Sequence, residues 1–188
     1  MAETPDQLRT RGRMRGLTTP ERVERFITEL GRVVRETVSV YFTGGVTAIL
    51  HGWRDATIDI DLKTVPESDE VLRAIPKLKE SLAINVELAA PDHFIPELPG
   101  WRERSLLIRR EGSVTFFHYD LYSQALAKIE RGHSQDLKDV RHILAEGLVD
   151  REILRELFVR IEPELYRYPA IDPPSFRRAV AEAIASNG

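Results

Sequence analysis

The stretch YFTGGVTAILHGWRDATIDIDL, residues 41–62, decides the fold of this chain. It continues a β-branched and aromatic segment, Val38 to Thr43, which is typical of a strand and runs directly into Gly44-Gly45. The apolar residues that follow stop at Gly52, as expected of a helix. The stretch therefore predicts a strand, a glycine turn, a helix and then a second strand.

The second strand carries two carboxylates on one face. From residue 57 to residue 62 the chain alternates strictly, with Ile58, Ile60 and Leu62 opposite Thr57, Asp59 and Asp61. Two aspartates that point the same way repel each other unless a cation neutralises them, and oxygen ligands favour Mg²⁺ or Mn²⁺. An isolated D-x-D is more often the solvated face of an antiparallel strand. Behind a glycine turn we favour a metal site.

The glycine turn offers a place for phosphate. Gly44 and Gly45 lack a Cβ, so their backbone N–H groups can approach an anion, and the start of the following helix adds partial positive charge. Most Gly-Gly turns merely reverse the chain. The interpretation therefore depends on the acids that follow.

A third acid would complete a site for two metal ions. The segment Ile84 to Leu88 alternates again and puts Glu87 on a polar strand face, so Glu87 is the first candidate. The alternative is an exposed strand residue without a role. Asp120 is the second candidate, although its position just before a helix suggests an N-cap.

The rest of the chain predicts an α/β (α+β) protein with a small mixed, twisted sheet, flanking helices and a C-terminal helical bundle. A helix begins at Thr19-Pro20, another spans about 69–82 with an interruption or kink at Pro76, and residues 106–109 and 114–118 form a hairpin. Helices follow from Leu121, from a cap at Ser134, near 153–157 and over about 175–185. We divide the chain into a basic tail (1–18), a core (19–119) and a helical region packed on it (120–188).

Composition excludes several classes of function. The chain has no cysteine among its 188 residues, so thiolate metal sites, disulfides and cysteine nucleophiles are excluded. It has no apolar run long enough for a membrane span and no signal-peptide core, so we expect a cytoplasmic protein without a membrane partner. The net charge of -3 argues against a surface devoted to nucleic acid. A local basic segment, interpreted as a solvated tail or alternatively an RNA-binding arm, contains Arg9, Arg11, Arg13 and Arg15.

These motifs resemble the polymerase-β-like nucleotidyltransferase superfamily. The resemblance is carried by G-G, thirteen intervening residues and D-x-D, with Arg54 and Thr57 in an R-x-x-T-x-D-x-D run. It is closest to the minimal bacterial branch and to AbiEii-type toxins, which carry a Lys-and-Arg helix followed by a D-x-x-D-type helix. Here ALAKIERGHSQDLKDV supplies, in that order, Lys128, Arg131, Asp136 and Asp139. One departure is Gly45, where many family members have serine.

The resemblance implies metal-dependent transfer of a nucleoside monophosphate from an NTP to an acceptor hydroxyl. It implies that Asp59, Asp61 and Glu87 hold Mg²⁺ or Mn²⁺ and act in catalysis. The nucleotide would then be bound by Gly44, Gly45, Arg54, Thr57, Lys128, Arg131, Asp136 and Asp139. The alternative for the last four is an interhelical salt-bridge network that only packs the helices.

The implied biological role is that of a toxin that modifies RNA or protein and is paired with an antitoxin. An antibiotic-modifying enzyme is a second candidate. A catalytically silent nucleotide-binding or protein-interaction module of the same fold is the rival from another class. We interpret the Pro-rich and aromatic segment from Pro91 to Trp101 as structural cover, with a lid over the nucleotide as the alternative.

Overall fold

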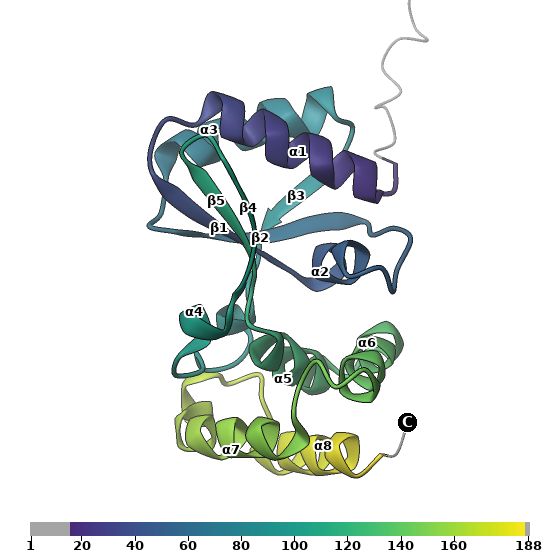
Figure 1. Ribbon diagram of the computed structural model, residues 1–188. Helices are drawn as coiled ribbons and strands as arrows, with labels where there is room; N and C mark the ends of the chain where they lie inside the picture. Colours follow the sequence, from purple (N-terminus) through teal and green to yellow (C-terminus); the bar gives the residue numbers. More distant parts are fainter. Residues whose placement is uncertain (1–15, 187–188) are drawn as a thin grey trace, which may run out of the picture.

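The computed structural model describes residues 16–186 (Figure 1). The basic segment from Arg9 to Arg15 lies outside the described residues. The helices and strands follow one another along the chain as α1 Pro20–Val33, β1 Val38–Thr43, α2 Gly44–Leu50, β2 Asp59–Val65, α3 Asp69–Ser81, β3 Asn85–Leu88, a 3₁₀ turn Pro91–His93, α4 Trp101–Arg104, β4 Leu106–Glu111, β5 Val114–His118, α5 Leu121–Arg131, α6 Ser134–Ala145, α7 Arg151–Ile161, a 3₁₀ helix Glu162–Arg167 and α8 Pro173–Ala185.

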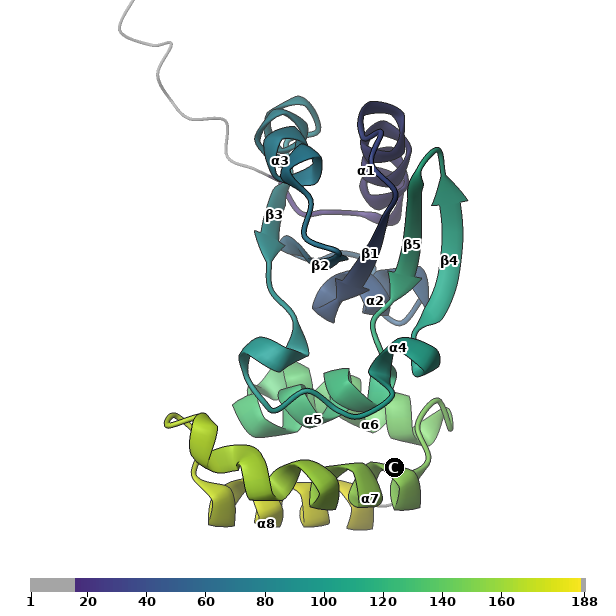
Figure 2. The same ribbon diagram turned by 90° about the vertical axis from the view of Figure 1, so that its left-hand side faces the viewer.

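One five-stranded mixed sheet forms the centre of the N-terminal half. The strand order is β3-β2-β1-β5-β4. β1 runs antiparallel to β2 and parallel to β5, β2 runs parallel to β3, and the hairpin β4–β5 is antiparallel. Helices α1 and α3 lie side by side over one face of this sheet (Figure 2). The predicted α/β fold with a small mixed sheet is confirmed.

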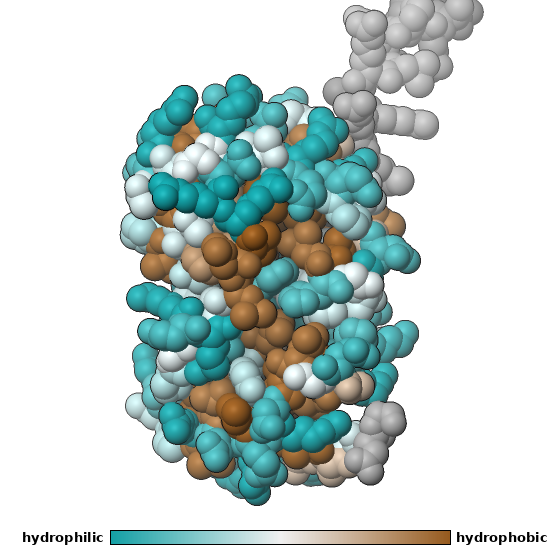
Figure 3. Space-filling model, in the orientation of Figure 1, coloured by the Kyte–Doolittle hydropathy of each residue, from teal (hydrophilic) through white to brown (hydrophobic). Residues whose placement is uncertain are grey.

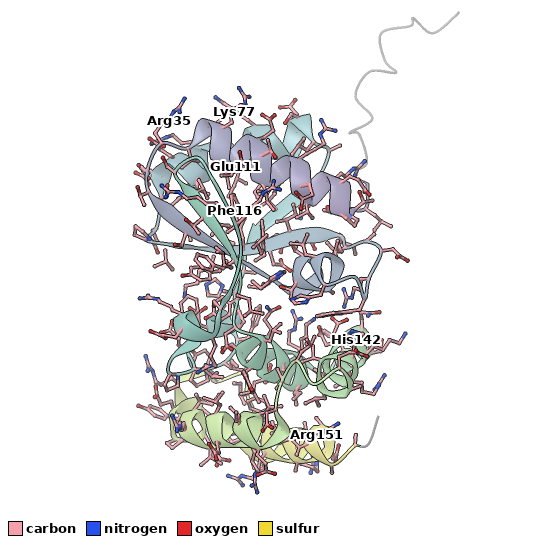
Figure 4. All side chains as sticks on the ribbon, in the orientation of Figure 1. Arg35, Lys77, Glu111, Phe116, His142 and Arg151 are labelled. Atoms are coloured by element: carbon pink, nitrogen blue, oxygen red, sulfur yellow. The ribbon has the colours of Figure 1, made fainter. Side chains whose placement is uncertain are left out.

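The first hydrophobic core lies between the sheet and the layer of α1 and α3. The apolar stripe of α1 is buried there because its residues recur at helical spacing. Phe116 of β5, which Figure 4 places beneath α1, is fully buried and stacks on Phe42 of β1 with ring centroids 5.7 Å apart. This packing fixes β1, and with it the strand end that leads into the glycine turn.

A second hydrophobic core holds the helical half together. It is formed by α5 to α8, together with Ile95 and Leu98 from the segment between β3 and α4. Figures 1 and 2 both show α5 and α6 between the sheet and the pair α7 and α8. Arg151 of α7, labelled in Figure 4, donates to the carbonyls of Ala183 and Ile184 and so neutralises the C-terminal end of α8.

Aromatic and histidine side chains fill the junction between the two cores. Trp101 and Tyr119 stack with ring centroids 4.3 Å apart, and the rings of His51 and His118 lie 4.4 Å apart. Burial, with a smaller contribution from His51, lowers the pKa of His118 to about 4, so this imidazole is neutral at physiological pH. His51 and His118 therefore pack the junction between the two cores.

An exposed apolar band lies along the edge of the sheet. Figure 3 shows a hydrophobic band in the middle of this face, where β4 lies in Figure 1. β4 is an edge strand, and it leaves Leu106 and Leu107 49% and 64% exposed. Within residues 16–186, no helix combines the length and the apolar character needed to cross a bilayer.

Three local predictions were wrong. Ile58 is 70% exposed, because β2 begins only at Asp59 and the preceding Thr57 forms an isolated bridge with Thr18. Helix α3 continues through Pro76, so the predicted interruption is wrong, while the alternative of a kink stays a prediction. Helix α6 begins at Ser134 with His133 at the N-cap position, so Ser134 does not cap it.

Candidate active site between the sheet and the helical half

The three predicted acids meet at one pocket. Asp59 and Asp61 flank the fully buried Ile60 on β2, so they point away from the first core. The parallel register pairs Asp61 with Glu87 of β3. A pocket of about 200 Å³, called here the acid pocket, is lined by all three carboxylates together with Gly44, Lys128 and Arg131.

Asn85 links two of these acids and was missed in the sequence. Its Nδ2 donates to Asp59 Oδ1 at 2.6 Å and to Glu87 Oε1 at 3.1 Å. The signal was present, because Asn85 precedes Glu87 by two residues on a strand and therefore shares its face. The amide positions the two acids without neutralising either of them.

The electrostatics of the acid pocket favour a cation. Burial, followed by repulsion from Asp59 and Glu87, raises the pKa of Asp61 to about 6, although Arg131 and Lys128 act in the opposite direction. Within the described residues no group of three or more acidic or histidine side chains is arranged so that it could hold a metal ion. The donor set of Asp59, Asp61 and Glu87 is nevertheless all oxygen and crowded with negative charge, which fits Mg²⁺ or Mn²⁺.

The raised pKa of Asp61 makes stability depend on pH. Because the folded protein holds this proton more tightly than an unfolded chain with the ordinary value of 3.8, ionised Asp61 destabilises the fold above about pH 6. This penalty fades as the pH falls from 6 toward 4. We therefore expect Asp61→Asn to raise the free energy of unfolding at pH 8 by up to about 3 kcal/mol. Chemical denaturation in EDTA from pH 4 to pH 8 measures it, and an equal effect at both ends would contradict the explanation.

Gly44 brings the backbone close to the acids. Its φ of +60° belongs to the left-handed region, and a Cβ at this position would lie 2.8 Å from Asp61 Oδ2. Its N–H already donates to Gln124 Oε1 at 2.9 Å, while Gln124 Nε2 donates to the carbonyl of Tyr119 and to Thr47 Oγ1. A glycine is therefore required at position 44, and helix α5 fixes the turn through Gln124.

Gly45 is constrained by a different neighbour. A Cβ on Gly45 would lie 2.6 Å from Thr57 Cβ, still closer to Thr57 Oγ1, and 3.4 Å from Arg54 Nη1. Thr57 thus fills the space that a side chain at position 45 needs. This contact explains why serine, present here in many members of the superfamily, cannot be accommodated by this chain without a change at Thr57.

We expect Gly45→Ala to destabilise the protein by about 1–3 kcal/mol, because overpacking forces Thr57 and the segment that leads into β2 to shift. Adding Thr57→Gly should recover most of this loss, since it removes both atoms that collide. Thermal unfolding of the wild type, the two single variants and the double variant gives a double-mutant cycle that measures the coupling between the two positions. Losses that simply add in the double variant would show that the steric explanation is wrong.

Helices α5 and α6 are joined by a network of charged side chains. Lys128 Nζ of α5 donates to Asp136 Oδ1 at 3.1 Å and to Asp139 Oδ2 at 2.7 Å, and Arg131 Nη2 donates to Asp136 Oδ1 at 2.7 Å. Asp139 is fully buried and also accepts from Arg54 and from Trp53 Nε1. The interhelical network considered as an alternative is therefore present.

The cationic residues of this charge network also line the candidate site. Lys128 and Arg131 line the acid pocket and a second, adjoining pocket of about 700 Å³, called here the outer pocket. The outer pocket is further lined by Gly45, Arg54, Thr57 and Asp136 and shares Gly44, Asp59 and Asp61 with the acid pocket. Asp139 lines neither pocket; it holds Arg54 and Lys128 from behind.

Asp120 does not join the other acids. Its side chain accepts from the backbone N–H groups of Tyr122 and Ser123 at the start of α5, and it pairs with Arg104 at 2.8 Å. The N-cap interpretation is confirmed. Among the two candidates for the third acid, Glu87 is the one that lines the acid pocket.

The chain matches the model of one protein family, described as nucleotidyltransferase of unknown function (DUF6036), over residues 22–171. The match includes the glycine turn, the acids of β2 and β3, and helices α5 and α6. Searches of the curated proteins and of the solved structures gave no match. The family description does not extend to the AbiEii-type branch, which stays a prediction. Because the matched region is most of its length, the chain belongs to this family of nucleotidyltransferases of unknown function.

Proposed function

We propose that this protein is a metal-dependent enzyme that transfers a nucleoside monophosphate from an NTP to an acceptor hydroxyl. The observation that carries the proposal is that Asp59, Asp61 and Glu87 line the same pocket as Gly44, Lys128 and Arg131. Phosphoryl transfer needs acids that bind metal ions, a glycine turn that leaves room for phosphate, and cationic side chains close to both. The family match supports the same class of reaction.

The balance of charge supports the need for divalent cations. The side chains that line the two pockets include three cationic groups and five carboxyl groups, namely Arg54, Lys128 and Arg131 against Asp55, Asp59, Asp61, Glu87 and Asp136. Such a site repels a free triphosphate. Asp59, Asp61 and Glu87 would hold Mg²⁺ or Mn²⁺, which supplies charge neutralisation and polarisation of the reacting phosphate when bound.

The chain's own residues divide the remaining work. In the proposal, Gly44 and Gly45 leave room for the phosphates, with Thr57 and Arg54 beside them in the outer pocket. Lys128 and Arg131 neutralise charge on the triphosphate and the leaving pyrophosphate. Asp139 is a positioning residue that fixes Arg54 and Lys128, and Glu87 assists deprotonation of the acceptor hydroxyl.

A comparison of two radiolabels tests the reaction class. We expect label from [α-³²P]NTP, but not from [γ-³²P]NTP, to enter macromolecules of a cell extract in the presence of Mg²⁺. Incorporation of the γ label would instead indicate a kinase and contradict the proposal. The absence of any incorporation or NTP binding by folded protein would favour the catalytically silent module.

The same experiment addresses the acceptor. On the resemblance of α5 and α6 to the helix pair of AbiEii-type toxins, we propose a toxin that acts on RNA or protein and is neutralised by an antitoxin. Label that nuclease removes would assign RNA, and label that protease removes would assign protein. If the label is found only on small molecules, the toxin role is wrong and an antibiotic-modifying enzyme is favoured.

A further inference from the structure

We propose that the side of the acid pocket that carries Phe94 holds the nucleobase of the NTP, which stacks on Phe94 beside the acids and is bound with little regard to its identity. This inference rests on the proposed nucleotidyl transfer and adds which part of the substrate is recognised and how strictly. It is carried by the one large aromatic side chain among the residues that line the acid pocket.

Phe94 is held firmly yet left open to solvent. It follows the 3₁₀ turn Pro91–His93, and its neighbours Pro91 and Ile95 are buried while Phe94 is 39% exposed. Asp92 anchors the turn, because its side chain accepts from Lys63 Nζ at 2.5 Å and from Tyr119 Oη at 3.4 Å, and its carbonyl accepts from Tyr168 Oη at 3.0 Å. An exposed aromatic ring on a braced turn is preorganised to stack on a flat ligand.

The surroundings of Phe94 match a base better than a phosphate. The acid pocket is also lined by the apolar residues Ala89, Ala90, Pro91 and Ala127. The guanidinium carbon of Arg131 lies 5.5 Å from the centre of the Phe94 ring, so the aromatic ring and a planar cation are presented together. At about 200 Å³ this pocket is smaller than the roughly 300–1,000 Å³ typical of whole-ligand sites. It fits one part of a nucleotide, and the outer pocket takes the phosphates.

Few uncharged polar side chains in the acid pocket can form hydrogen bonds with the edge of the base. Away from the charged groups, the polar residues that line the acid pocket are Thr43 and Gln124. Thr43 Oγ1 donates to the carbonyl of Ala89, and both ends of the Gln124 amide are bonded within the protein. Sites that bond the edge of a substrate reject analogues by about 10⁴-fold or more, whereas apolar contact discriminates by only about 10–200-fold. We therefore expect weak selection among the four bases.

Binding of two probes in the presence of Mg²⁺ tests the inference. The first is an α,β-methylene analogue of ATP, and the second is inorganic tripolyphosphate, which lacks a base. Calorimetric titration of the wild-type protein should give an affinity for the analogue about tenfold higher than for tripolyphosphate, as stacking on one aromatic ring provides. Phe94→Ala should remove this difference and leave tripolyphosphate binding unchanged. Phe94→Trp should retain it, and the four corresponding NTP analogues should bind within about tenfold of one another.

Tyr166→Ala provides the matched control, because Tyr166 is an 80% exposed aromatic residue that lines neither pocket. Unchanged analogue affinity in Phe94→Ala would overturn the inference, as would an equal loss for both probes or a preference for one base above about a hundredfold. If the folded wild type binds neither probe, the proposed function itself fails, so the two failures are distinguishable.

Discussion

Asp59→Asn is expected to lower the rate of nucleotidyl transfer by at least about a hundredfold while the protein stays folded. Loss of a group that merely orients a metal ligand typically costs about 10–100-fold, and a ligand itself should cost more. The fold should tolerate the change, because Asp59 is a partly exposed end residue of β2 and an asparagine oxygen can still accept from Asn85 Nδ2. Transfer of the α label, measured beside a thermal unfolding curve, separates activity from stability.

The exposed Glu67, which lines neither pocket, provides the control for this experiment. Glu67→Gln removes one negative charge close to the other end of β2 and should leave the rate unchanged. If Asp59→Asn retained wild-type activity, the acid pocket would not be the catalytic site. If both variants lost activity alike, the effect would reflect overall charge rather than the acid pocket.

Asp139→Ala is expected to destabilise the protein by about 3–5 kcal/mol, because it leaves buried positive charge without its partner. The side chain of Asp139 is fully buried and accepts from Lys128, Arg54 and Trp53, and that of Lys128 is itself only 5% exposed. The remaining partner of Lys128 is Asp136, which also pairs with Arg131. Urea denaturation of the variant measures the loss.

Two comparisons define what that loss means. Glu29→Gln removes a carboxylate from a solvent-exposed pair with Arg32 and should cost less than about 1 kcal/mol. The double variant Lys128→Met/Asp139→Leu should be less destabilised than Asp139→Leu alone, since it removes the unpaired charge as well. A small effect of Asp139→Ala, similar to that of Glu29→Gln, would show that the buried network is not what joins α5 to α6.

Local patterns in the sequence predicted the elements that carry the candidate site. Alternation around Ile60 put Asp59 and Asp61 on one strand face, and the same rule identified Glu87. The pairing of β2 with β3 then brought these acids together. Helix-end signals were similarly informative, because Asp120 has the chemistry and position of an N-cap and acts as one.

Long-range contacts could not be predicted in the same way. Gln124 is a polar residue at a buried helical position, and nothing in its neighbourhood indicates that it bonds to Gly44, 80 residues earlier in the chain. The exposure of Ile58 depends on the bridge between Thr57 and Thr18, which begins β2 later than the alternation suggests. Likewise, the composition of the segment from Pro91 to Trp101 does not reveal that Phe94 lines the acid pocket. The bond between Gly44 and Gln124 joins the sheet to the helical half, and the bridge joins residues 39 positions apart in the chain, so neither follows from a local pattern.

The pairing of the four charged residues on α5 and α6 could also be learned only from the structure. Sequence spacing placed Lys128 with Arg131 and Asp136 with Asp139, but it left open whether they would bind a ligand or one another. The contacts show that Asp139 is fully engaged within the protein, whereas Lys128 and Arg131 both pair with acids and line the pockets. A buried carboxylate that fixes cations beside a site is compatible with a role in nucleotide binding through Arg54 and Lys128.

The most direct test of the central claim is the binding of a non-hydrolysable NTP analogue, measured by calorimetry with Mg²⁺ and again in EDTA, for the wild-type protein and Asp59→Asn. The proposal predicts binding by the wild type that requires Mg²⁺ and is lost in Asp59→Asn, because the metal offsets the negative charge of the acid pocket and Asp59 is needed to hold the metal. Binding that persists equally in EDTA and in Asp59→Asn, or no binding by the folded wild type, would contradict a metal-dependent nucleotide site between the sheet and the helical half.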